Sequence, residues 1–130
     1  MRYSNDNRPL VDQLVRMTYK TGEYAGKVVE TGGARAVVQV LAVLKHPQQG
    51  NLHHPYDPDV DMFHERRALS HNEKALAAYG DLSSYTGEVP EYKASLVRAL
   101  EQEAAGLDRL RRWAERGQAT LEIVKQDYRL

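Results

Sequence analysis

The positions of the prolines limit the folds available to this chain, because they interrupt regular structure in its middle third. Four of the five prolines lie between Pro47 and Pro90. Proline fixes φ and removes a backbone donor, so Pro47, Pro55 and Pro58 predict a long irregular loop over residues 45–61. A loop of this length inside a compact domain is usually functional.

The segment before these prolines has the pattern of β-strands. Residues 15–20 alternate between apolar and polar side chains, which is the period of a half-buried strand. A second run, 24–31, is rich in β-branched residues and is followed by Gly33, which can supply the positive φ of a tight hairpin. Residues 34–44 are apolar on both faces for part of their length, as is typical of a central strand. A further strand is expected within 72–87.

The C-terminal part changes to a helical period. Pro90 suits a first helical turn, where its missing N–H costs nothing. Gly106 interrupts the apolar stripe that follows, so we expect two antiparallel helices broken near this residue, with one long helix as the alternative. The stripe consists of Leu96, Leu100, Ala104, Leu107, Leu110, Ala114, Leu121, Val124 and Tyr128.

These patterns predict one α+β domain. Residues 1–87 are expected to form a small β-barrel of about five strands that carries the loop. Residues 88–130 are expected to form one or two C-terminal helices, packed on the barrel or extending from it.

Composition excludes several kinds of function. The chain has 130 residues, with 18 Lys plus Arg, 18 Asp plus Glu, and no Cys. A neutral chain lacks the cationic face of a general nucleic-acid binder, so no nucleic-acid partner is expected. Without Cys there is no disulfide and no thiolate nucleophile. No apolar run has the length of a membrane span, so we expect a soluble, cytoplasmic protein with no direct membrane anchor in this chain.

The charge is unevenly distributed, and its acidic region contains every histidine. Residues 46–90 carry three cations and seven anions. The five histidines are His46, His53, His54, His64 and His71.

Three interpretations of the histidines remain open. They could form a zinc site, although His64 lacks the second histidine one turn later that the zincin motif requires. They could instead brace the loop by hydrogen-bonding its unpaired backbone groups. Because they lie near acidic side chains, they could also sense pH.

A second candidate surface lies on the helical segment. Trp113 is surrounded in the sequence by Arg109, Arg111, Arg112 and Arg116, and Trp and Arg are enriched at interface hot spots. The alternative is that Trp113 belongs to the core and the arginines form a solvated face.

Three blocks of sequence closely resemble the kinase-associated lipoprotein B (KapB) family of spore-forming bacilli. The most specific block runs from His46 to Pro55 and is followed by Phe63-His64-Glu65-Arg66-Arg67-Ala68-Leu69. Residues 19–26 resemble the family's first hairpin, and residues 88–96 resemble its helix entry.

This resemblance implies an SH3-like β-barrel with a C-terminal helical part. It also implies a non-enzymatic accessory protein, with no catalytic residues and no cofactor, that supports a membrane sensor histidine kinase in the phosphorelay leading to sporulation. Any membrane association would then come through the kinase.

We therefore expect protein binding, with the histidine-rich loop favoured over the helix as the docking surface. A homodimer through the apolar helical stripe is a further expectation. A zinc-binding enzyme or sensor that uses the His46 to His71 cluster is the alternative function. The predicted partner-binding residues are His46, His53, His54, Phe63, His64, Glu65, Arg66 and Trp113.

Overall fold

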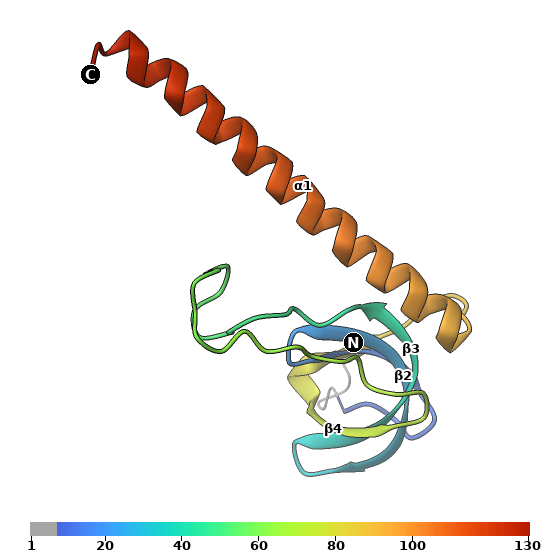
Figure 1. Ribbon diagram of the computed structural model, residues 1–130. Coiled ribbons are helices and arrows are strands. Elements are labelled where there is room, and N and C mark those ends of the chain that lie inside the picture. Colours follow the sequence, from blue (N-terminus) through green and yellow to red (C-terminus); the bar gives the residue numbers. More distant parts are fainter. Residues whose placement is uncertain (1–7) are drawn as a thin grey trace.

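The computed structural model describes residues 8–130 and places five antiparallel strands before one long helix (Figure 1). The strands are β1 (Leu14–Tyr19), β2 (Gly22–Gly32), β3 (Arg35–Lys45), β4 (Lys74–Ala78) and β5 (Leu82–Ser84). A single 3₁₀ turn, η1 (Tyr79–Asp81), connects β4 to β5, and the helix α1 spans Tyr92–Asp127.

The first three strands confirm the alternating pattern of the sequence. β1 buries Val15 and Met17, and β3 buries alternate residues from Ala36 to Ala42. Gly33 has φ of +54° in the turn between β2 and β3, as the hairpin prediction requires. The segment 72–87, predicted to contain one more strand, contains both β4 and β5.

The strand order is β4-β3-β2-β1-β5, and the sheet is not closed. Three irregularities in register between β2 and β3 bend the sheet, as β-bulges do. A barrel also needs hydrogen bonds between its two edge strands. Over residues 8–130, β4 pairs with β3 and the three-residue β5 pairs with β1, but no ladder joins β4 to β5. The predicted closed barrel is therefore wrong, and the fold is an open, bent sheet.

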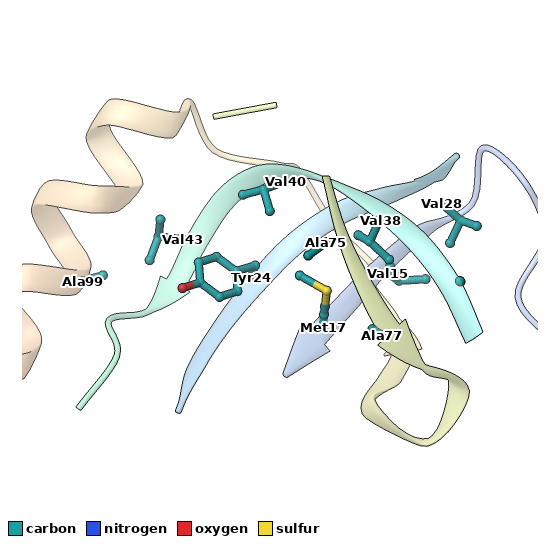
Figure 2. Close-up of a cluster of buried hydrophobic side chains, with 11 residues drawn as sticks. Val15, Met17, Tyr24, Val28, Val38, Val40, Val43, Ala75, Ala77 and Ala99 are labelled. Atoms are coloured by element: carbon teal, nitrogen blue, oxygen red, sulfur yellow. The ribbon is translucent and has the colours of Figure 1, made fainter. Parts of the chain in front are cut away.

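The core lies on the concave side of this sheet (Figure 2). Val15, Met17, Tyr24, Val38 and Val40 are almost completely buried there. The first turns of α1 cover the end of this cluster next to β3 with a few small and medium-sized residues. These helix residues are Tyr92, Ser95, Leu96 and Ala99.

Ser95 fixes the helix to the sheet. Its hydroxyl accepts a hydrogen bond from the backbone N–H of Val43 at 2.9 Å and donates one to the carbonyl of Tyr92 at 2.7 Å. Val43 lies near the end of β3, so this buried contact sets where α1 leaves the sheet.

The C-terminal part is a single helix, so the predicted break near Gly106 is wrong. Glycine in a helix costs about 1 kcal/mol relative to Ala, but it does not by itself end a helix. No proline follows Gly106 or Gly117, and both glycines face open space. In the described chain no residue after Ala99 is buried, and α1 runs outward from the sheet (Figure 1).

Candidate functional site

Residues 46–73 form one continuous irregular segment between β3 and β4, which we call the long loop. It projects away from the sheet (Figure 1). The predicted loop 45–61 lies within it except for Lys45, which ends β3, and the long loop continues to the start of β4. Despite the absence of helix or strand, its two ends are joined by a specific set of hydrogen bonds.

The side chain of Gln49 joins the outgoing and returning chains of the long loop. Its carbonyl oxygen Oε1 accepts a hydrogen bond from the backbone N–H of Arg66 at 2.7 Å. Its amide nitrogen Nε2 donates to the carbonyls of Arg66 and Pro47, at 2.9 and 3.0 Å. Gln49 thus replaces the backbone pairing of a strand, and the loop stem is closed without one.

Arg66 completes the stem from the other side. Its guanidinium donates to the carbonyls of Gln48 and Gly50. Gly50 also donates its N–H to the carbonyl of His64 at 2.8 Å. Arg66 is a predicted binding residue, and its half-buried side chain is engaged in holding the loop together.

Gly50 lets Phe63 lie across the stem. Gly50 has φ of +97°, and a Cβ atom there would be 3.0 Å from the Phe63 ring. Phe63 contacts the stem through part of its ring but remains 64% exposed. A large aromatic side chain is therefore presented at a fixed position on the surface.

The tip of the long loop is acidic and partly apolar. Asn51 and Asp57 each accept a hydrogen bond from the backbone N–H two residues later, both at 2.9 Å, which forms two local turns. A shallow hollow of about 380 Å³ lies beside them. Its lining comprises Asn51, His54, Asp57, Asp59, Val60, Asp61 and Met62.

The five histidines have separate environments. The Nδ1 of His46 lies 3.0 Å from the carbonyl of Pro47, so His46 alone hydrogen-bonds the loop backbone as the bracing interpretation expects. His71 stacks on the ring of Tyr92, with centroids 5.3 Å apart. His53, His54 and His64 are exposed, and their rings make no hydrogen bond within residues 8–130.

These positions do not support the zinc interpretation. Among the described residues, no group of three His, Asp or Glu side chains is arranged to hold a metal ion. Proximity in the sequence is therefore not proximity in space for these histidines.

Two tyrosines connect the end of the long loop to the sheet and to α1. The hydroxyl of Tyr24 accepts a hydrogen bond from the N–H of Leu69 at 3.2 Å, and the hydroxyl of Tyr92 donates to the carbonyl of Leu69 at 2.6 Å. Burial raises the pKa of both phenols, Tyr24 and Tyr92, above the ordinary value of 10.0. The loop is therefore fixed relative to both neighbouring elements.

The second predicted surface is on a different element. Trp113 is 76% exposed on α1, so it is not a core residue. Two of its arginine neighbours are engaged in ion pairs along the helix. These pairs are Arg111 with Asp108 and with Glu115, and Arg112 with Asp108, at 2.7 to 2.9 Å. Arg111 and Arg112 hold the pKa of the Asp108 carboxyl below its usual value.

Sequence reasoning missed the residues that hold this site in place. Gln49, Tyr24 and Tyr92 act through contacts with residues more than fifteen positions away, which no local pattern records.

Within residues 8–130, no helix has the length and apolar character needed to cross a membrane.

Comparison with known proteins identifies the same family that the three sequence blocks resemble. The family model described as kinase-associated protein B matches residues 19–129. A kinase-associated lipoprotein B of Bacillus subtilis (strain 168) is 40% identical over 116 residues, covering 88% of this chain and 91% of the relative. The crystal structure of kinase-associated protein B from Bacillus cereus is 36% identical and has a TM-score of 0.66, covering 94% of this chain and 99% of that one. The chain therefore belongs to the kinase-associated protein B family.

Proposed function

We propose that this protein is a non-enzymatic accessory protein that binds a membrane sensor histidine kinase and supports the phosphorelay that initiates sporulation. Membership of the kinase-associated protein B family supports the association with a kinase. The Bacillus subtilis relative is named a lipoprotein, which indicates a membrane link for that protein. In the present chain the membrane association would come through the kinase.

The observation that carries the proposal is the fixed geometry of the long loop. Its stem is held by Gln49 and Arg66, while Phe63, Met62 and Tyr56 remain exposed. Exposed apolar side chains that gather in one patch are typical of protein interaction sites, whereas single ones are ordinary. Because the loop is already ordered, binding loses less conformational entropy than it would with a flexible segment.

The polar groups of the loop define the kind of partner surface it would fit. Asp57, Asp59 and Asp61 lie together around the hollow at the tip, and His53 and His64 have free ring nitrogens within the described structure. Arg66 is directed inward, so it does not neutralise the tip. A basic surface with an apolar centre on the kinase would complement this arrangement in charge and in shape.

Replacing His53 and His64 together by Ala should weaken kinase binding about tenfold, because two moderate interface contacts contribute about 1.4 kcal/mol in total. Binding is measured by pull-down from sporulating cells with the intact protein, with the kinase identified by mass spectrometry, and sporulation frequency is the second readout. Neither ring bonds the rest of the described chain, so the fold should be unchanged.

Two further variants serve as controls. Leu76→Ala removes an exposed side chain from β4, outside the long loop, and should leave kinase binding unchanged. Trp113→Ala tests the helical surface. If Trp113→Ala abolished kinase capture while the double histidine variant bound and signalled normally, the loop would not be the docking surface.

A further inference from the structure

The exposed part of α1 carries a regular apolar stripe. From Leu100 to Tyr128 the positions alternate in steps of three and four residues, which is a heptad repeat. We call this stripe the α1 seam. It comprises Leu100, Leu107, Leu110, Ala114, Gly117, Leu121, Val124 and Tyr128, with Glu103 as its one charged position.

The opposite face of the helix is charged and exposed to solvent. Four seam residues lie seven positions apart, from Leu100 to Leu121, and the residue directly after each of them is acidic. The acidic residues are Glu101, Asp108, Glu115 and Glu122. Asp108 and Glu115 form the ion pairs with Arg111 and Arg112. Ile123 is the single large apolar residue on this outer face after Leu100.

A helix of this kind requires a partner along its seam. Steps of three and four residues give a period of 3.5, which keeps apolar residues facing a second helix rather than a globular core. The sheet does not cover the seam, because Ala99 is the last buried residue of α1 in the described chain. Gly106 and Gly117 each cost about 1 kcal/mol in an isolated helix, so packing has to stabilise the distal turns.

We propose that the α1 seam pairs with the same seam of a second copy of this chain in an antiparallel coiled coil. Burying the exposed parts of the seam side chains and of the adjacent Trp113 in two copies would remove roughly 1,500 Å² of accessible surface, the size of a standard specific interface. The area available on one face of the helix is therefore sufficient for a stable dimer.

The order of residues in the seam determines the orientation. In a parallel pair the two Glu103 side chains would face each other in one layer, with repulsion between like charges. In an antiparallel pair centred between Ala114 and Gly117, these two small residues face each other across the axis. Large residues then meet large ones: Leu110 faces Leu121, Leu107 faces Val124, and Glu103 faces Tyr128 of the second copy.

The dimer is independent of the kinase-binding proposal, since it uses α1 and not the long loop. Leu121 and Ile123 provide a matched pair for the test. Both are exposed aliphatic residues near the end of α1, at 68% and 62%, but only Leu121 lies in the seam.

Sedimentation equilibrium of the intact protein should give the mass of two 14.8 kDa chains for the unaltered protein and for Ile123→Glu. Leu121→Glu should raise the dimer dissociation constant at least tenfold. A monomer at 100 μM protein, or an equal effect of the two substitutions, would overturn the proposal. If the protein were monomeric and Leu121→Glu abolished kinase capture, the seam would belong to the kinase instead.

Orientation is tested with spin labels on Gln126→Cys, a position on the outer face in a chain without other cysteines. In the antiparallel dimer the two labels lie at opposite ends, about 30 Å or more apart along the axis. In a parallel dimer they lie at the same level, about 20 Å apart or less. The shorter distance would contradict the antiparallel arrangement.

Discussion

Arg66 illustrates how a residue in a family-like motif can have a structural task that its sequence context does not reveal. It lies in the block from Phe63 to Leu69 and is one of the predicted partner-binding residues. Its guanidinium joins the carbonyls of Gln48 and Gly50 across the stem of the long loop. A planar group with several donors suits this position, because it can bond two carbonyls at once.

Arg66→Lys should therefore loosen the loop. A lysine ammonium cannot span both carbonyls in the same way, and the loss of about one charged hydrogen bond should lower the free energy of unfolding by about 1–2 kcal/mol. Urea denaturation and amide exchange at Gly50 measure the two effects. Arg67→Lys, at an exposed neighbour, is the control. Equal stability of both variants would show that the Arg66 contacts are unimportant.

The individual elements differ in how well the sequence predicts them. Strands β1 to β3 are predictable, because alternate residues face core and solvent and Gly33 ends the hairpin. The prolines also predict the first part of the long loop, up to residue 61, but not its continuation to β4. The break near Gly106 is a wrong prediction, because glycine lowers helix stability without ending the helix when no turn follows. Contacts between elements, such as those of Tyr24 and Tyr92, have no local sequence signal.

The junction of β2, the long loop and α1 should be sensitive to high pH. Burial raises the pKa of Tyr24, so the folded state favours the neutral phenol. The resulting stability is fully present below the unfolded-state pKa of about 10 and is lost as the pH rises through the higher folded-state pKa. Stability should therefore fall above pH 10.

Tyr24→Phe tests this effect by urea denaturation from pH 8 to pH 11. At pH 8 the variant should be about 1 kcal/mol less stable, because the N–H of Leu69 loses its acceptor. The difference in the free energy of unfolding between the two proteins should narrow above pH 10. Only the unaltered protein has the Tyr24 phenol, which ionises more readily in the unfolded state and so destabilises the fold. Tyr56→Phe, at an exposed phenol, is the matched control. A constant gap over the whole range would be inconsistent with the assigned cause.

On the scale of the whole molecule, a small bent sheet supports two projecting surfaces. The long loop and α1 project from the sheet separately (Figure 1). Tyr24 and Tyr92 fix the returning end of the loop, and Ser95 fixes the start of the helix. The sequence predicts the order of sheet, loop and helix. It does not predict that the sheet stays open, because closure depends on whether β4 and β5 pair, and β5 has only three residues.

The two surfaces are separate, so they allow the two roles that we propose: kinase binding by the long loop and pairing with a second copy through the α1 seam. Amide hydrogen exchange of the intact protein, with and without the cytoplasmic region of the captured kinase, distinguishes the surfaces in one measurement. We expect slower amide exchange upon kinase binding at residues 50–64, with exchange in the distal turns of α1 unchanged. Slower exchange confined to α1, with the loop unaffected, would contradict the assignment of kinase binding to the long loop.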